Sequence, residues 1–422
     1  DLGDDVVLMP GLVDPHVSTE DVAVGTRSAA QGGITSVIDY GSDGAPAAIT
    51  PEGVDAWRDA VTGESTVDVG LWGAAVPDNL GRLGDLLDRG VFGISAVARG
   101  KGVEGAPTLD LPELLTAAED VLGRGELIAV DAGVDVLPDL LDVVRRTSGR
   151  LHVRSVADAE ELPLLRAARE EGLAVTASTS PHLLALVSEL TYGGPAVATL
   201  DPPLRDAANR ELLWGALRDG TIDAVASARL GLSVVWTEAR RRGFDLADVA
   251  RWMATSTAAI VGLSDRGEIR EGLRADVVAV ADDEAFVVLP GSRDLGRSDS
   301  VYEQRALAGV VRWTMRTGGT IDPRAMPFGT VLNVNVPFLP EEEIRGVHVC
   351  AMSDAWFSDT FRQSENGSWR NIGSSMVPGS GDRVYDDHAL EQHRSIAVTP
   401  LQFDMTSYRF LPQLESWFDD RH

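Results

Sequence analysis

Histidine is the side chain best suited to proton transfer near neutral pH. Only three of the seven histidines, His16, His152 and His182, precede residue 320. The chain has one lysine, Lys101, and one cysteine, Cys350. A single cysteine excludes an intrachain disulfide and a zinc cluster of thiolates, and we interpret it as a buried core residue. A catalytic scheme that needs four histidines and a lysine in this part of the chain cannot be assembled.

Acidic side chains outnumber basic ones, with 65 Asp and Glu against 37 Lys and Arg and a formal net charge of −28. The field of such a protein repels nucleic acid and anionic membrane surfaces, so neither is expected as a partner. No apolar run approaches the roughly 20 residues that span a bilayer. The first residues, DLGDD, lack the basic segment of a signal peptide. The sequence therefore predicts a cytoplasmic globular protein.

Short β-branched runs alternate with longer helical patterns from about residue 9 to 264. Eight runs predict strands, among them VVLMPGLVD, GITSVIDY, ELIAVDAG and GRLHVRS. Stretches such as LPELLTAAEDVLGRG have apolar residues at i, i+3 and i+4 and predict helices between them. Eight such units favour a (β/α)₈ barrel over residues 10–264, with one unit shortened or missing around 131–160 and the active site where the strands end. An open doubly wound sheet is the alternative.

The segments MPGLVDPHV, GTRSAAQGGITSVIDY, VTASTSPHLL and GEIREGLRADVVAV together resemble the allantoinase family, in the cyclic amidohydrolase group with dihydroorotase and hydantoinase. The resemblance covers about residues 1–318. It implies a TIM barrel over 10–264 and a β-sandwich, of which residues 1–9 and 265–320 would be a remnant. It also implies hydrolysis of a cyclic amide at a two-metal centre.

The resemblance also indicates that most of the family's metal ligands are replaced. It places the family's HxH on His16-Val17-Ser18, its carboxylated lysine on Ser95, its next histidines on Asp131 and at or beside Val153, and its final aspartate on Ala228. A two-metal centre needs imidazoles, carboxylates and the bridging lysine, so no metal and no cofactor are expected. His152 is expected to face away from the site, because one step along a strand reverses the side chain.

The same resemblance brings polar residues to the mouth of the barrel. In the functional interpretation Asp131 orients His16 as a general base in a metal-free pocket, and His182 is a further catalytic candidate. The candidates for substrate binding are Ser18, Ser95, Arg205 and Arg229. In the alternative interpretation these residues fill a closed mouth, His182 caps a helix, and Arg205 forms an ion pair with Asp206 or another neighbour.

Residues from about 324 onward carry a second resemblance. FGTVLNVNVPFLPEEEIRGVHV and SIAVTPLQFDMTSYRFLPQL are similar to the C-terminal part of the SurE family of 5′-nucleotidases, over about 324–418. That family's metal and phosphate ligands lie in an N-terminal half that has no counterpart here. In the family this segment exchanges between subunits, so the resemblance implies a homo-oligomer held together through an α+β segment, residues 324–422.

These observations lead to a hypothesis in which the barrel is an allantoinase-like pseudoenzyme that has lost its metal site. It would serve as a non-hydrolytic scaffold or assembly protein and could bind a partner enzyme. One alternative is a metal-free enzyme that acts on a ureide, a cyclic amide or a nucleotide-like substrate. Another is a subunit that completes a SurE-like phosphatase with a second chain.

Overall fold

The computed structural model describes residues 6–17, 21–40, 48–98, 107–189, 200–226, 231–288 and 301–316, with residue 197 and short stretches after residue 330. The chain divides into two compact units, residues 1–325 and 326–422. In the part of the chain that the structure describes, no helix has the length and apolar character needed to cross a bilayer.

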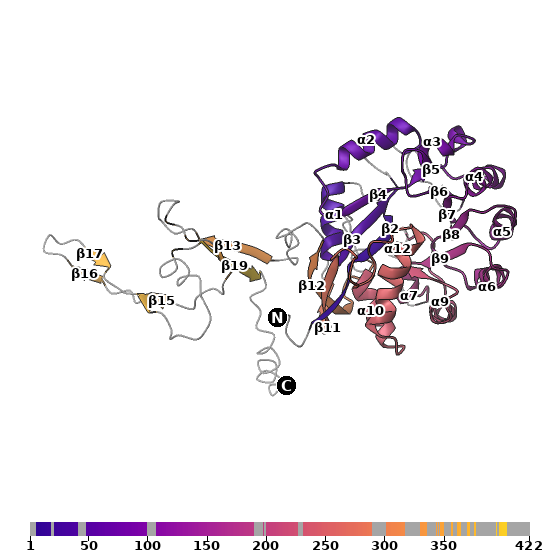
Figure 1. Ribbon diagram of the computed structural model, residues 1–422. Coiled ribbons are helices and arrows are strands. Elements are labelled where there is room, and N and C mark those ends of the chain that lie inside the picture. Colours follow the sequence, from indigo (N-terminus) through magenta and orange to yellow (C-terminus); the bar gives the residue numbers. More distant parts are fainter. Residues whose placement is uncertain are drawn as a thin grey trace. The chain divides into compact units, whose positions relative to one another are not determined.

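Parallel strands lie inside a ring of helices in the first unit (Figure 1). They are β2 (Leu12–Val17), β3 (Ile34–Asp39), β4 (Asp68–Leu71), β5 (Gly73–Ala74), β6 (Ile94–Val97), β7 (Leu127–Asp131), β8 (Arg150–Val153), β9 (Val175–Thr179) and β10 (Ala224–Val225). Only Trp72 separates β4 from β5, so the nine segments make eight strands. They pair in chain order, as β2-β3-β4 and β5-β6-β7-β8-β9-β10. This is the order of a (β/α)₈ barrel, whereas a doubly wound sheet reverses its order at a switch point.

The predicted α/β fold with a parallel sheet is thus confirmed. Helices connect the strands: α1 (Val22–Gln31), α2 (Pro51–Val61), α3 (Leu83–Leu87), α4 (Leu111–Gly123), α5 (Leu137–Arg146), α6 (Leu162–Glu170), α7 (Pro181–Ala185), α9 (Ala207–Asp219), α10 (Gly231–Arg240), α11 (Leu246–Ala250), the π-helical turn η3 (Arg251–Thr255) and α12 (Ser256–Ile260). The unit around 131–160, expected to be shortened or missing, contains α5 between β7 and β8. The unit is therefore not missing: its helix is complete, and the short connections on either side of α5 are what the sequence spacing reflected.

Helix α4 shows how the sequence sets these elements. Asp110 accepts a hydrogen bond from the backbone N–H of Glu113 at 2.9 Å, and the Glu113 carboxylate accepts one from the N–H of Asp110 at 3.0 Å. This capping box satisfies two donors that the first turn leaves free. The buried residues Leu114, Ala118 and Val121 follow at helical spacing and face the core.

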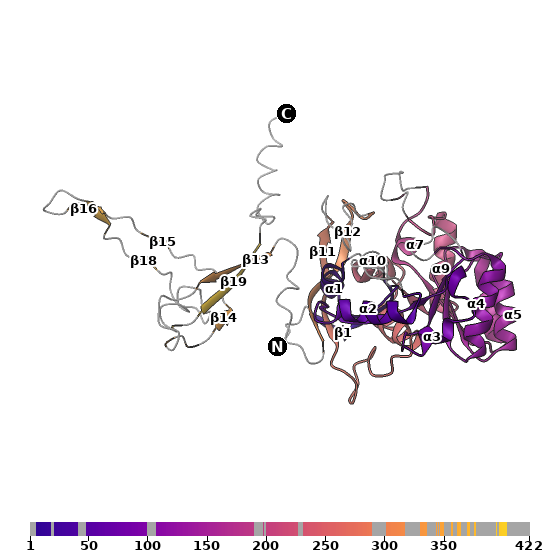
Figure 2. The same ribbon diagram turned by 90° about the horizontal axis from the view of Figure 1, so that it is seen from above.

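A three-stranded antiparallel sheet lies beside α1 and α10 (Figure 2). Its strands are β1 (Val7–Pro10), β11 (Val277–Val287) and β12 (Ala306–Met315), in the order β1-β11-β12. The Ser233 hydroxyl of α10 donates to the carbonyl of Gly309 at 2.6 Å, and the Thr314 hydroxyl donates to the carbonyl of Ala30 at 2.7 Å. The sheet is therefore bonded to two helices of the barrel, while its assignment to a sandwich remnant stays a prediction.

The second unit contains a three-stranded sheet of β13 (Thr330–Asn335), β19 (Ile396–Gln402) and β14 (Val347–Val349), with β19 in the centre. It pairs antiparallel with β13 and parallel with β14. Two hairpin-like pairs are also present, β15 (Trp356–Phe357) with β18 (Ser375–Met376), and β16 (Phe361–Gln363) with β17 (Trp369–Asn371).

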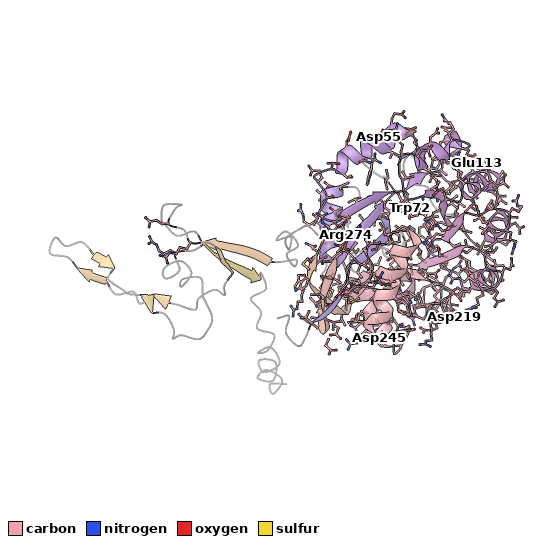
Figure 3. All side chains as sticks on the ribbon, in the orientation of Figure 1. Asp55, Trp72, Glu113, Asp219, Asp245 and Arg274 are labelled. Carbon is pink, nitrogen blue, oxygen red and sulfur yellow. The ribbon has the colours of Figure 1, made fainter. Side chains whose placement is uncertain are left out.

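Asp68, at the start of β4, is bound by three guanidinium groups. Its carboxylate lies 2.8 Å from Arg266, 2.7 Å from Arg274 and 3.3 Å from Arg316. Arg266 is 9% exposed and also donates to the hydroxyl of Ser36 at 2.7 Å. Arg274, labelled in Figure 3, lies where the barrel meets the β1-β11-β12 sheet. Asp68 therefore ties the barrel to residues far along the chain.

We expect Asp68→Asn to lower the free energy of unfolding by about 2–3 kcal/mol, because the nearly buried Arg266 loses a charged acceptor. Asp55→Asn is the matched control. Asp55 also binds two arginines, Arg58 and Arg89, but all three side chains are at least 40% exposed, so the loss should stay below about 1 kcal/mol. Urea unfolding of both variants tests this. Equal effects would mean that Asp68 is an ordinary surface ion pair.

Candidate active site

Four aromatic rings meet at the carboxyl edge of the parallel strands. The His16 ring stacks on His152 with centroids 5.0 Å apart, on Trp72 at 5.8 Å and on Tyr40 at 6.2 Å. Trp72 is fully buried and donates from its indole N–H to the carbonyl of Pro15 at 2.7 Å. Figure 3 shows Trp72 inside the ring of strands. The candidate site is therefore a ring cluster in the interior of the first unit.

The contact between His16 and His152 shows how strongly the sheet curves. His16 belongs to β2 and His152 to β8, which are five strands apart in the pairing order. In a flat sheet that separation is about 24 Å, at about 4.8 Å per strand. The observed 5.0 Å between the rings requires the two strands to face each other across the interior.

His152 is held at both ring nitrogens. Nδ1 lies 2.9 Å from the Thr176 hydroxyl and Nε2 lies 3.0 Å from the Ser178 hydroxyl. Thr176 and Ser178 are two residues apart on β9, so they share one face of the sheet. Both nitrogens of His152 are thus engaged, and the ring has a fixed orientation.

Arg154 follows β8 and brings a buried positive charge to the site. Its side chain is 4% exposed, and Nη2 donates to the Asp131 carboxylate at 2.9 Å and to the Ala96 carbonyl at 3.3 Å. Its guanidinium carbon lies 4.8 Å from the centre of the Tyr40 ring. Burial alone lowers the pKa of Arg154, but the Asp131 charge and the contact with Tyr40 outweigh it and raise the pKa, so the group stays charged.

Among the residues that the structure describes, three buried polar atoms of this cluster lie within hydrogen-bond geometry of no partner: Nδ1 and Nε2 of His16, and Nε of Arg154. Buried polar atoms are nearly always paired, so an unpaired group calls for an explanation such as a ligand or an ordered water. His16 with its two nitrogens and Arg154 with its free N–H can both accept and donate. The cluster is therefore suited to a small polar molecule.

Burial and charge keep the histidines neutral. The pKa of His16 lies well below its usual value of 6.5, because of burial first and then the electrostatic influence of the neighbouring His152 and Arg154. Burial, followed by the charge of Arg154, lowers the pKa of His152 to about 3. Burial also raises the pKa of the Tyr40 hydroxyl. At neutral pH the site thus holds two uncharged imidazoles, a protonated phenol and one guanidinium.

The structure brings only some of the sequence candidates together. Asp131 lies next to the cluster but pairs with Arg154, and both nitrogens of His16 lack a partner. The proposed Asp131–His16 pair is therefore not formed, because the nearby guanidinium is the stronger partner for a carboxylate. Ser95 is buried on β6, in register with Ala129 of β7.

The remaining candidates lie away from the cluster or outside the described residues. His182 is in α7, where burial lowers its pKa to about 4 and Nε2 has no partner. Arg205 forms an ion pair at 2.9 Å with Asp158, so the expected ion pair exists with a partner other than Asp206. Ser18 and Arg229 lie outside the described residues.

The sequence analysis missed His152, Arg154, Tyr40 and Trp72. The expectation that His152 faces away from the site was wrong, since its ring contacts His16. The sequence analysis placed the side chain of Val153 on the inner face of the strand. Because side chains alternate between the two faces, this placed His152 on the wrong face. The signal that could have found the site is the spacing of His152 and Arg154, two polar residues two apart in an apolar strand.

Among the described residues, no group of three or more His, Cys, Asp or Glu side chains has the geometry to hold a metal ion. His152 uses both nitrogens for hydroxyl groups, and Asp131 binds a guanidinium. His16 is therefore the one side chain of these three that does not already bind another residue and could coordinate a metal ion.

Comparison with known proteins identifies the family. Residues 3–318 match the amidohydrolase family. The chain belongs to the amidohydrolase family. It is 36% identical over 380 residues to allantoinase of Streptomyces avermitilis, an alignment that covers 76% of this chain and 85% of the relative. It is 27% identical to allantoinase of Arabidopsis thaliana, over 65% of this chain and 69% of that one.

Solved structures of the family share the fold. L-hydantoinase (dihydropyrimidinase) from Arthrobacter aurescens superposes with a TM-score of 0.68 at 21% identity, over 74% of this chain and 84% of that one. The inactive dihydroorotase-like domain of a multifunctional protein from Chaetomium thermophilum has a TM-score of 0.62 at 16% identity, over 75% and 94%. At such identities the likeness shows the fold alone, and it is shared by active and inactive proteins.

The hypothesis of a non-hydrolytic scaffold is wrong in the light of these relatives. Allantoinases from a bacterium, a plant, an amphibian and a yeast match this chain, the first at 36% identity. They point to an allantoinase-like hydrolase. The error lay in equating an inferred replacement of metal ligands with the loss of activity.

The neutral state of His152 predicts how stability depends on pH. Its pKa is about 3 in the folded protein and 6.5 in the unfolded chain. Between these values the unfolded chain binds a proton that the folded protein does not, so stability falls as the pH drops below about 6.5. The slope from this residue is at most about 1.4 kcal/mol per pH unit.

His152→Gln lacks this titration. We therefore expect the difference in free energy of unfolding between wild type and His152→Gln to narrow as the pH falls from 7 to 5. Urea unfolding across that range measures it. A difference that stays constant with pH would show that His152 is protonated in the folded protein too.

Proposed function

We propose that the protein is a hydrolase that opens a cyclic amide or ureide of the allantoin type at the cluster of His16, His152 and Arg154. The observation that carries the proposal is the set of three buried, unpaired atoms, two on His16 and one on Arg154. A cyclic ureide offers carbonyl oxygens that accept hydrogen bonds and ring N–H groups that donate them. The relatives named allantoinase support this substrate class.

The proposal includes a degenerate metal site, because the side chains present do not fit the family's two-metal centre. Of the positions that the resemblance aligns with metal ligands, only His16 offers an imidazole with free nitrogens. Ser95 cannot form a carboxylated lysine, and Asp131 is bound to Arg154. A guanidinium beside His16 would repel a divalent cation. The reaction is therefore assigned to the chain's own groups.

Arg154 is placed to polarise the substrate carbonyl. Its unpaired Nε–H can donate to the carbonyl oxygen, and its charge stabilises the negative charge that this oxygen acquires when water adds to the carbon. Asp131 and the Ala96 carbonyl fix the guanidinium from the other side. In this role Asp131 is a positioning residue that acts through Arg154.

His16 is placed to move the proton. A neutral imidazole accepts a proton from the attacking water and returns it to the ring nitrogen as the carbon–nitrogen bond breaks. One water is consumed and the ring carbon–nitrogen bond breaks: the ring N–H becomes an NH₂ by taking the proton that His16 carries, and the carbonyl carbon becomes a carboxylic acid that loses its proton to solvent. His152 and Trp72 pack on the His16 ring and hold it in one orientation.

We expect Arg154→Gln and His16→Gln each to reduce turnover of allantoin at least about 100-fold, since each removes a group that acts in the transition state. Arg166→Gln is the control, because Arg166 forms an exposed ion pair with Asp219. Loss of allantoin is measured with and without a chelator. Turnover that needs added metal, or that survives Arg154→Gln, would refute the assignment.

The second unit is proposed to hold a homo-oligomer together, in line with the resemblance of residues 324–418 to the SurE tail. In the described stretches of this unit the sheet has three strands, with β13 and β14 on either side of β19. Small sheets with open edges are marginal unless another chain or domain covers them. Exchange between two copies supplies that cover with contacts already present in the sequence.

Multi-angle light scattering of the intact chain should therefore give a dimer or a tetramer at micromolar concentration. Deletion of residues 324–422 should give a monomer or an aggregate, because the intersubunit strands are lost. An intact chain that is monomeric throughout this range would rule out the oligomer.

A further inference from the structure

A second concave site of 450 Å³ lies on the first unit, apart from the ring cluster and sharing no residue with it. Residues of α9 and of the C-terminal part of α10 with the turn after it line it, together with the end of α7 and the residue before β12. Pockets of this volume hold small organic molecules. The charged residues that line it are Arg210, Glu211, Glu238, Arg241, Arg242 and Arg305.

The charge of this pocket opposes the charge of the protein. Four arginines face two glutamates, which leaves two positive charges in a chain of net charge −28. In so acidic a protein a concave positive site attracts small anions, while the surrounding field repels large ones. The pocket is therefore suited to a small anionic ligand.

Two of the arginines have structural roles. Arg242 donates to both carboxylate oxygens of Glu211, at 2.6 and 3.0 Å, and to Glu238 at 2.8 Å. It also lies 4.9 Å from the centre of the Trp214 ring. Arg210 donates to Glu211 at 3.1 Å. Both glutamate carboxylates are therefore hydrogen-bonded to arginines that line the pocket.

The other two arginines keep free donors. Arg241 makes one contact with Glu238, at 2.6 Å, and its side chain is 64% exposed. Arg305 is half-buried, and within the described part of the chain its guanidinium has neither a hydrogen bond nor an ion pair. A guanidinium presents five donors in a planar fork that matches two oxygens of a phosphate.

We propose that this pocket binds a small organic phosphate, with Arg305 and Arg241 gripping the phosphoryl group. Inorganic phosphate alone would fill only a small part of 450 Å³. The lining also includes Ala185 and Val187, which offer an apolar wall for the organic part. The site is separate from the ring cluster, so the inference does not depend on the proposed hydrolase activity.

Isothermal titration calorimetry of the full chain with inorganic phosphate, ribose 5-phosphate and adenosine 5′-monophosphate tests the inference. We expect at least one ester to bind more tightly than inorganic phosphate and to displace it. Arg305→Gln and Arg241→Gln should each weaken binding about tenfold or more, the effect of losing a charged hydrogen bond. Arg166→Gln, which changes the same charge elsewhere, should leave it unchanged.

Each other outcome overturns a stated part of the inference. If inorganic phosphate binds and neither ester displaces it, the pocket is a site for a free anion, and the proposal of an organic phosphate is refuted. No binding at millimolar concentration, or equal binding by wild type and Arg305→Gln, would refute the site. Circular dichroism of the variants checks the fold. Because the Arg305 guanidinium has no hydrogen bond or ion pair with any described residue, its replacement should leave the spectrum unchanged.

Discussion

The buried charge of Arg154 is the constraint on which the candidate site depends. Burying an unpaired guanidinium costs several kcal/mol, so such a group persists only with good partners. Asp131 and the Ala96 carbonyl supply them from β7 and β6, the neighbouring strands. The same charge helps to hold His16 and His152 in the neutral form. Burial, which is the larger cause, and the charge of Arg154 together keep both imidazoles neutral.

The sequence allowed the parallel α/β fold to be predicted because its signals are local. Strand runs of β-branched residues, helical spacing and caps such as Asp110 with Glu113 each depend on a few neighbouring residues. The site could not be predicted in the same way. His16 and His152 are far apart in the chain. Their contact depends on the curvature of the sheet and on which side chains of β8 point to its inner face. Because the inward-facing positions were assigned one residue too far along, both His152 and Arg154 were missed.

The use of arginine in place of lysine recurs in the structure. The chain has 36 arginines and one lysine. At several separate places in the structure, one planar guanidinium donates to more than one acceptor. Three guanidiniums converge on Asp68, Arg242 joins two glutamates of different helices, and Arg154 spans two strands. A lysine has a single charged centre and could not satisfy several fixed acceptors in this way.

The relation to allantoinases and the proposed metal-free site are compatible once the two roles of a two-metal centre are considered separately. A two-metal centre polarises the carbonyl and also lowers the pKa of the attacking water. A fixed guanidinium such as that of Arg154 can take over the first role by electrostatic stabilisation, but it does not coordinate the water. The second role then falls to a base, and His16 is the group of the cluster with unpaired nitrogens. Its lowered pKa, caused first by burial, keeps it unprotonated at neutral pH and so able to accept a proton.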